Sequence, residues 1–214
     1  MTDSGDVFQP SYFDPLSTAR LTRIICEMFE RQPLTSMAVE VPKFDGSGLY
    51  AIYYRGSSVA TYTRLVDTEI PVYAGQGASH NSATGKNAES PRPVYLRLKA
   101  HRKSIEGGGL PTADFAFRVL LMPHVHANLG EDGLRRLYQP VWNAILTGFG
   151  SHEQGATTRQ SKRSKWDTFH QGRERTDGGV AHDPRDLATM VEEHIDKQLT
   201  RYPDVPWRHP DTSD

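Results

Sequence analysis

Cysteine is nearly absent from this sequence, in which Cys26 is the only one among 214 residues. A lone cysteine cannot form a disulfide within the chain, and it excludes a zinc site built from several cysteines. Cys26 lies in the apolar run Leu21–Phe29, where a small thiol packs like any other buried hydrophobic side chain. Neither a disulfide framework nor cysteine-based metal chemistry is therefore expected.

Long apolar runs are missing as well. None approaches the roughly 20 consecutive residues that a membrane-spanning helix needs. The opening segment, MTDSGDVFQP, is acidic and polar, unlike a signal peptide. We therefore expect a cytoplasmic protein that has no membrane partner.

An excess of charge of one sign is also lacking, since the formal net charge is −1. The charges are nevertheless segregated. Arginine and lysine concentrate over residues 92–103 and 159–175, whereas acidic residues collect near the two ends of the chain. A neutral protein with local basic stretches can still bind a polyanion through them. Any single charge run is more often only a solvated surface.

Hydrophobic periodicity predicts the main elements. Helical spacing indicates helices over residues 17–31, 94–106 and 186–202, and a weaker one over 130–139 that Gly133 penalises. Aromatic and β-branched residues predict strands over 48–55, 68–74 and 115–122. Residues 75–93 are expected to form a flexible loop, and His124 and His126 to lie in a turn.

The order of these elements indicates an α+β fold, an α/β sandwich in which helices flank a small, mostly antiparallel central sheet. We expect one compact unit with three parts. These are an N-terminal arm and helix (1–45), a core (46–150), and a tail with the C-terminal helix (151–214).

Several polar side chains stand where chemistry on a phosphate could occur. Tyr50 and Tyr73 lie near the ends of neighbouring predicted strands, and a tyrosine hydroxyl can donate or accept a proton. Arg97 and His101 are four residues apart on one predicted helix, so they share a face. A guanidinium group binds phosphate oxygens, and an imidazole titrates near neutral pH.

Two further polar residues follow along the chain. Glu131 opens a predicted helix, and one carboxylate can hold one Mg²⁺ when phosphate and water complete its shell. Asn143 follows the helix-ending Pro140. Taken singly, such residues are more often packing residues, exposed helix residues, helix-start acids or turn residues.

Their order and spacing as a set are specific. Gly48-Leu49-Tyr50, Tyr73-Ala74-Gly75, Arg97 with His101, Glu131 before Pro140, and Asn143 resemble the GIY-YIG nuclease superfamily. The segments YQPVWNAILTGFGSHEQG and SKWDTFHQGRE are similar to the C-terminal signature of its short type II restriction endonucleases. The resemblance covers roughly residues 18–175.

This sequence departs from the family pattern at two places. Family members often carry a lysine after the second tripeptide, where this chain has Gln76. The residues before the metal-binding glutamate are usually apolar, but here they are Asn128, Leu129 and Gly130, and Asp132 stays an alternative metal ligand.

The resemblance implies a role for each residue of the set. Glu131 would bind one Mg²⁺, for which Mn²⁺ can substitute. Tyr50 would pass the proton of the attacking water to His101, in preference to forming a covalent phosphotyrosine. Arg97 and Tyr73 would hold the phosphate, and Asn143 would orient the site by hydrogen bonds. Basic side chains outside this centre are expected to contact DNA, namely Arg102, Lys103, Arg159, Lys162, Arg163, Lys165 and Arg173.

The resemblance implies a bacterial type II restriction endonuclease that cleaves double-stranded DNA at a GC-rich palindrome such as CCGCGG. A homodimer matches a palindrome, and the expected dimer elements are segment 1–16 and the helix face over 190–199. For the helix face, packing within its own chain is an equal alternative. A cognate DNA methyltransferase would protect the host DNA. The alternatives are a GIY-YIG nuclease acting on damaged or structured DNA, and a DNA-binding relative with weakened catalysis.

Overall fold

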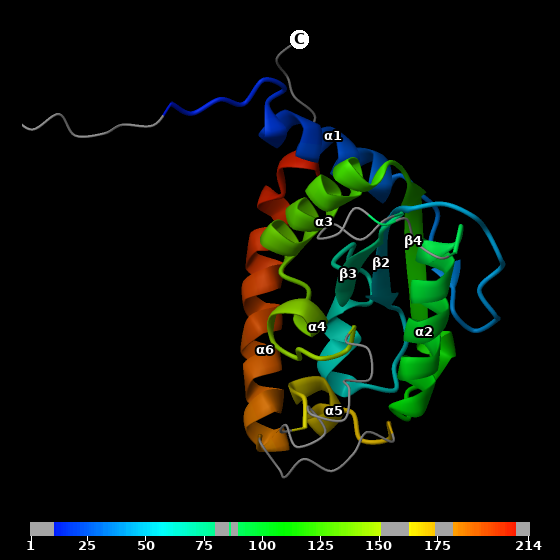
Figure 1. Ribbon diagram of the computed structural model, residues 1–214. Coiled ribbons are helices and arrows are strands. Elements are labelled where there is room, and N and C mark those ends of the chain that lie inside the picture. Colours follow the sequence, from blue (N-terminus) through cyan, green and yellow to red (C-terminus); the bar gives the residue numbers. More distant parts are fainter. Residues whose placement is uncertain (1–10, 80–85, 87–89, 151–162, 174–181, 209–214) are drawn as a thin grey trace, which may run out of the picture.

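The computed structural model describes residues 11–79, 86, 90–150, 163–173 and 182–208 (Figure 1). In this part of the chain, four antiparallel strands form one sheet in the order β1-β4-β2-β3. The strands are β1 (Thr35–Ser36), β2 (Gly48–Tyr54), β3 (Tyr73–Gly77) and β4 (Phe115–Leu121). The predicted α+β fold with a small antiparallel sheet is confirmed.

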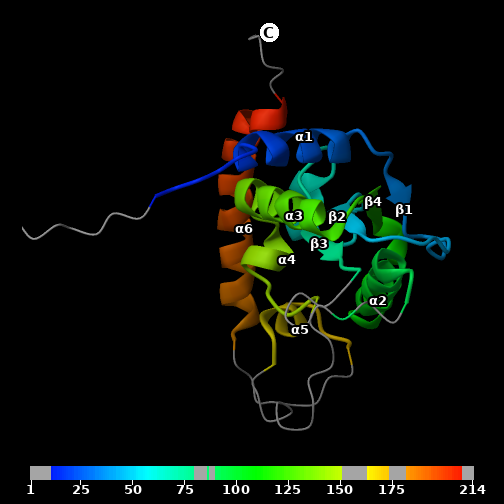
Figure 2. The ribbon, with the colours of Figure 1, turned by 45° about the horizontal axis from the view of Figure 1, so that its top comes forward.

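Helices surround this sheet, and α6 runs along one side of the molecule (Figures 1 and 2). The α-helices are α1 (Thr18–Glu30), α2 (Pro93–Gly107), α3 (His124–Tyr138), α4 (Val141–Ala144), α5 (Lys165–Phe169) and α6 (Pro184–Arg201). Short 3₁₀ helices are η1 (Ala60–Leu65), η2 (Thr112–Asp114), η4 (Tyr202–Asp204) and η5 (Pro206–Arg208). Among the described helices, none combines the length and the apolar character that crossing a membrane requires.

Strand β2 lies inside the sheet and all 7 of its residues are buried. Successive side chains of a strand point to opposite faces, so a strand that is buried throughout must be covered on both. Leu49 packs against Gly130 of α3 on one face. On the other face, Tyr50 contacts His101 of α2. The central strand thus places Tyr50 beside α2.

Helix α3 begins at His124, six residues before the predicted start at residue 130. His124 and His126 therefore lie in its first turn, and their assignment to a loop turn is wrong. The two glycines that lowered the helix prediction allow close packing. A Cβ at Gly130 would lie 2.7 Å from Leu49 Cδ2, and one at Gly133 would lie 2.4 Å from Thr22 Cγ2. Tertiary packing here outweighs the low helix propensity of glycine.

Strand β3 is shifted relative to its prediction, since it covers Tyr73–Gly77 rather than residues 68–74. Pro71 carries no backbone N–H with which to extend the strand pairing. Gly75 and Gly77, which favoured a loop, lie in the strand and pair with Tyr50 and Gly48 of β2. Both positions need glycine, because a Cβ would collide with neighbours at either one. At Gly77 it would lie 2.5 Å from the backbone nitrogen of Val94, at the start of α2.

The apolar face of α6 packs within its own chain. Leu187, Val191 and Ile195 are at most 1% exposed, while Met190 is 39% exposed. Of the two readings of this helix face, the structure therefore supports packing within the chain and not a dimer element, because its apolar side chains already have partners in the core.

Candidate active site

Five of the predicted site residues come together where β2, β3, α2 and α3 meet. The Tyr50 hydroxyl and His101 Nε2 are 2.7 Å apart, and both side chains are buried. The ring of Tyr73 lies 4.9 Å from that of His101 and 6.3 Å from that of Tyr50, between ring centroids. Arg97 and Glu131 are close enough to shift the pKa values of both tyrosines. The set that the sequence spreads over 82 positions, from Tyr50 to Glu131, is thus one cluster.

Burial raises the pKa of Tyr50 well above its usual range; Tyr73 and Glu131 add to the rise, and Arg97 opposes it. Burial also raises the pKa of Tyr73, Glu131 adds to this rise, and Arg97 again opposes it. Both phenols therefore keep their protons at neutral pH. Tyr50 can act on a water molecule only if another group takes its proton, and His101 Nε2 lies in position to accept it.

Glu131 faces this cluster, and its neighbour in sequence does not. The Glu131 side chain is 18% exposed and lies 3.5 Å from Arg135. The Asp132 side chain is 62% exposed and lies 3.5 Å from Arg136. Burial raises the pKa of Glu131, while Arg135, a hydrogen bond from Gln76 and the charge of Arg97 oppose that rise. Of the two acids, the structure therefore places Glu131 beside the tyrosines.

Two glycines keep space around the tyrosine hydroxyls. A Cβ at Gly75 would lie 2.7 Å from the Tyr50 hydroxyl oxygen. A Cβ at Gly150 would lie 2.3 Å from the Tyr73 hydroxyl oxygen. Any side chain at these positions would collide with the two hydroxyl groups.

Asn143 lies beside the site and fixes the strand that carries Tyr73. Its Oδ1 accepts from the backbone N–H of Ala74 at 2.8 Å, and its Nδ2 donates to the carbonyl of Ala74 at 3.0 Å. The backbone N–H of Trp142 donates to Val72 O at 2.8 Å. Helix α4 thereby bonds Ala74 on the outer side of β3 and Val72 just before it, and so holds Tyr73 and Gly75 in place.

The residues at Glu131 suit a single hard cation. Within the described residues, no three His, Cys, Asp or Glu side chains are grouped as a metal site, so Glu131 would act as a lone carboxylate ligand. Gln76 Oε1, on a side chain that hydrogen-bonds Glu131, is buried without a hydrogen-bond partner. Mg²⁺ prefers oxygen ligands and keeps several waters, so one carboxylate with substrate phosphate oxygens fits its chemistry.

Two features of the site were not predicted from the sequence. Phe149 stacks on His101, with 4.7 Å between ring centroids and 15° between planes. Gln76, which replaces the usual lysine, donates to Asn128 of α3. The position of Phe149 between two glycines, Gly148 and Gly150, was the one sign in the sequence of its stacking on His101. Nothing in the spacing indicated the second.

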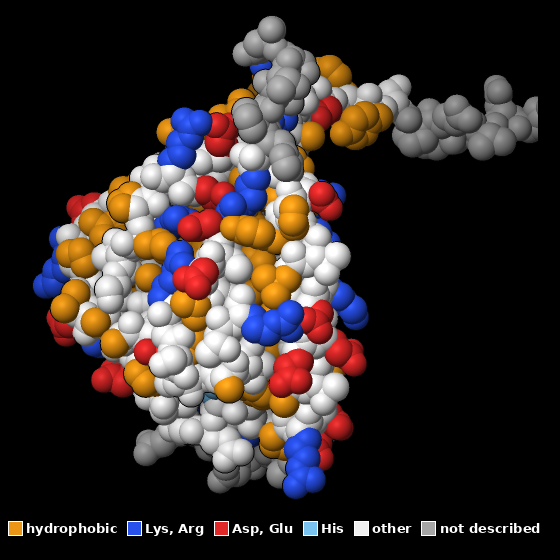
Figure 3. All heavy atoms as spheres, turned by 180° about the vertical axis from the view of Figure 1, so that it is seen from behind, with side chains coloured by type: hydrophobic (Ala, Val, Ile, Leu, Met, Phe, Trp, Pro, Cys, Tyr) orange, Lys and Arg blue, Asp and Glu red, His pale blue; other side chains and the backbone are white. Residues whose placement is uncertain are grey.

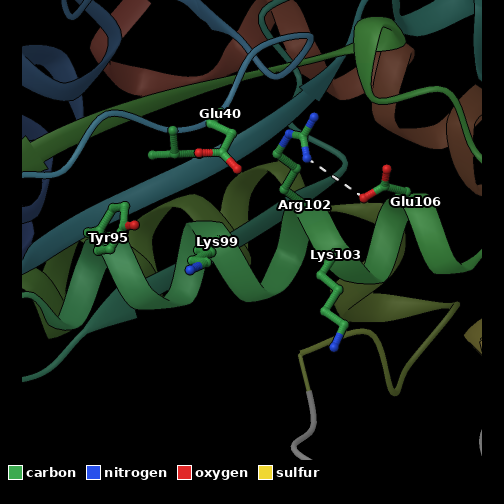
Figure 4. Close-up of a pocket in the computed structure, with 7 residues that line it drawn as sticks. Glu40, Tyr95, Lys99, Arg102, Lys103 and Glu106 are labelled. Atoms are coloured by element: carbon green, nitrogen blue, oxygen red, sulfur yellow. Dashed lines mark ion pairs between the residues drawn. The ribbon is translucent and has the colours of Figure 1, made fainter.

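The residues expected to bind DNA do not form one surface. Arg159 and Lys162 lie outside the described residues, and Arg163 and Lys165 are half-buried beside the start of α5. Arg102 and Lys103 point away from the face of α2 that carries Arg97 and His101. They line a pocket of about 190 Å³ together with Glu40, Val41, Tyr95, Lys99 and Glu106 (Figure 4). Arg102 donates to Met37 O at 3.1 Å and lies 3.7 Å from Glu106.

The prediction that Arg173 contacts DNA is wrong. Its side chain is 7% exposed and its Nε donates to Asp167 at 2.5 Å. Because protein groups surround the guanidinium, it has almost no surface to offer a phosphate. On the face opposite that of Figure 1, positive and negative side chains are interspersed rather than gathered by sign (Figure 3).

The chain is similar to one known family. The family model described as Eco29kI GIY-YIG domain matches residues 42–199, well over half of the chain. This range contains β2 to β4 and all of the clustered residues. None of the curated proteins matches the chain.

Proposed function

Because the chain belongs to the Eco29kI family of GIY-YIG domains, and is thus a nuclease, we propose that it is a type II restriction endonuclease. It would hydrolyse phosphodiester bonds of double-stranded DNA at a specific site. The observation that carries this proposal is the 2.7 Å contact between the Tyr50 hydroxyl and His101 Nε2. This contact joins the Tyr50 hydroxyl, which can bind a water molecule, to His101 Nε2, which can accept the proton of the hydroxyl.

Each side chain of the cluster has a separate role in the reaction. Arg97 and Tyr73 bind the oxygens of the scissile phosphate. Arg97 suits this role because its charge acts on Tyr50, Tyr73 and Glu131 alike. The Tyr50 oxygen takes a proton from the attacking water as its own proton passes to His101 Nε2. No free tyrosinate forms, which agrees with the raised pKa of Tyr50. The leaving group is the 3′-oxygen of the cleaved strand.

Glu131 is the residue that would hold Mg²⁺, or Mn²⁺ in its place. When bound, the cation supplies stabilisation of the charge on the phosphate and on the leaving oxygen. Gln76 and Arg135 keep the carboxylate turned toward the cluster. Asn143 keeps β3, and with it Tyr73, in register beside Tyr50.

Digestion of unmethylated plasmid DNA tests this function. With Mg²⁺, the protein should yield discrete fragments whose mapped ends share one GC-rich palindrome, and EDTA should prevent cleavage. Prior treatment with the cognate DNA methyltransferase should protect the DNA. Cleavage confined to flaps, junctions or damaged DNA would instead indicate a repair or structure-specific nuclease. Binding without cleavage would indicate a weakened relative.

A restriction enzyme with one nuclease centre per chain must cut both strands, and a palindrome has two-fold symmetry. We propose a homodimer that uses the described part of the N-terminal arm and the outer side of α1. Tyr12, Phe13 and Leu16 are 89%, 83% and 70% exposed, and Ile24 and Met28 of α1 are 48% and 44% exposed. These five side chains form the dimer surface of this proposal.

Sedimentation with an oligonucleotide bearing one recognition site should show two chains per duplex. Substituting Tyr12 and Phe13 together by serine should weaken the dimer at least about tenfold, because two exposed aromatic anchors are lost. Val39→Ser is the matched control, since Val39 is 66% exposed but lies outside the dimer surface. One chain per duplex that still breaks both strands would refute the dimer and point to sequential nicking.

A further inference from the structure

A buried arginine lies behind the catalytic histidine. Arg173 Nη1 donates to Phe149 O at 3.2 Å, and Nη2 donates to Gly148 O at 3.3 Å. Nη1 also donates to Ser104 Oγ at 3.3 Å, on α2 and three residues after His101. Arg173 is therefore bonded both to the turn that follows α4 and to the helix that carries His101.

A rigid support holds the guanidinium itself. Its Nε donates to Asp167 at 2.5 Å, and the two side chains are 7% and 5% exposed. The guanidinium carbon lies 4.2 Å from the centre of the Trp166 ring. Asp167 also accepts from Ser164 Oγ at 2.6 Å, at the start of α5. An ion pair that is stacked and hydrogen-bonded in this way has little freedom to move.

The turn held by Arg173 shapes the immediate surroundings of His101. The Phe149 ring lies parallel to the imidazole at 4.7 Å and edge-on to the Tyr73 ring at 5.1 Å. Phe149 is 1% exposed, so it also closes the site on this side. Gly148 has a φ of 106° and Gly150 lies against the Tyr73 hydroxyl, so the turn allows little change of sequence or path.

We propose that Arg173 is a positioning residue, which sets the His101 imidazole for proton transfer by fixing the Gly148–Phe149 turn and α2 together. The proposal rests on the proposed nuclease function of the same site. It assigns a role to the segment 163–173, which lies far along the chain from the other site residues. Arg173 would act on His101 through its bonds to Phe149 O and Ser104 Oγ.

Arg173→Lys is the first test, since lysine keeps the charge but cannot bond two carbonyls, a hydroxyl and a carboxylate with one planar fork. We expect kcat to fall between about tenfold and a hundredfold, because small displacements of a catalytic group are costly. KM for DNA should change little. The titration of the His101 ring, followed by NMR on the DNA-free protein, should shift upward as water reaches the imidazole.

Arg118→Lys is the matched control. Arg118 is also buried, ion-paired to Glu69, bonded to a backbone carbonyl (Gln32 O, 2.8 Å) and placed 5.1 Å from a tyrosine ring. These contacts of Arg118 involve neither the Gly148–Phe149 turn nor α2. Its substitution should lower the melting temperature without moving the His101 titration. A merely structural Arg173 would behave in the same way as Arg118.

Phe149→Leu separates the effect of the stacked ring from that of the bonded carbonyls, because it removes the ring and leaves the carbonyls in place. It should reproduce the shift of the His101 titration. If Arg173→Lys does not fold, Ser104→Ala removes one contact and should give a smaller shift in the same direction. An unshifted His101 titration in Arg173→Lys would overturn the proposal. If that variant does not fold, an unshifted titration in both Phe149→Leu and Ser104→Ala would overturn it. Since this NMR titration needs no DNA cleavage, it can succeed or fail independently of the nuclease function.

Discussion

Replacing Glu131 by glutamine should lower the rate of DNA cleavage by at least about a hundredfold, because the change removes the carboxylate that would hold the metal ion. Loss of metal-ion stabilisation costs several kcal/mol in the transition state, and each 1.4 kcal/mol is about tenfold in rate. DNA binding, measured by gel shift in Ca²⁺, should stay within a small factor of the wild type. Mn²⁺ binding by the protein, followed by EPR, should weaken in parallel with cleavage.

The folded protein should tolerate this substitution. Burial raises the pKa of Glu131, so folding favours its protonated form. Its contribution to stability is present below the pKa of the unfolded carboxyl and is lost as pH rises through the higher folded pKa. At neutral pH, a neutral glutamine should therefore leave the melting temperature unchanged or raise it.

Asp132→Asn is the matched control for Glu131→Gln. It alters the adjacent residue of α3 by the same chemical change, but Asp132 points to solvent beside Arg136. Its cleavage rate should stay near that of the wild type. If Asp132→Asn is inactive while Glu131→Gln cuts normally, the metal ligand has been assigned to the wrong acid.

The second large effect is expected from Tyr50 and His101, the pair proposed to move the proton. Tyr50→Phe removes one buried hydroxyl and should reduce kcat by about a hundredfold to ten thousandfold, the usual range for a lost acid–base group. His101→Ala should have a similar effect, partly relieved at high pH, where hydroxide ion makes a base less necessary. Single-turnover cleavage over a range of pH measures both effects.

The chain offers a second tyrosine–histidine pair as the control. The Tyr62 hydroxyl lies 2.8 Å from His170 Nε2, and both are buried, outside the active site. Burial, followed by the charge of Arg173, lowers the pKa of His170 to about 3, so this pair stays neutral over the working range. Tyr62→Phe should cost about 1–3 kcal/mol of stability, because partners of the hydroxyl are left unpaired. The cleavage rate of Tyr62→Phe should not fall. A Tyr50→Phe variant that still cleaves DNA would rule out the proton path.

The sequence predicted which residues lie together better than it predicted the elements that carry them. Tyr50, Tyr73, Arg97, His101 and Glu131 could be named because their order resembles a family, and the structure brings them together. The start of α3 and the bounds of β3 could not be predicted, since both depend on glycines. At Gly75, Gly77, Gly130 and Gly133 a glycine is required by a neighbour that is distant in sequence. Local propensity contains no information about such neighbours.

Arg173 shows a second limit of sequence reasoning. An arginine in a basic stretch is predicted to meet solvent and, in a nuclease, DNA. Its burial depends on Asp167, Trp166 and the carbonyls of a turn more than twenty residues earlier. The sequence shows that these residues are present, but only the fold shows that they surround one guanidinium group.

The two edges of the sheet have a consequence for protein in concentrated solution. Strand β1 has only 2 residues. On the outer side of β3, the Asn143 amide bonds Ala74, and the Trp142 N–H bonds the carbonyl of Val72, which directly precedes the strand. Open strand edges are the usual starting points for aggregation by intermolecular pairing, and these edges leave little backbone for such pairing. Copies of the folded chain should therefore meet through side-chain surfaces, and prolonged storage should not promote the growth of a continuous sheet across molecules.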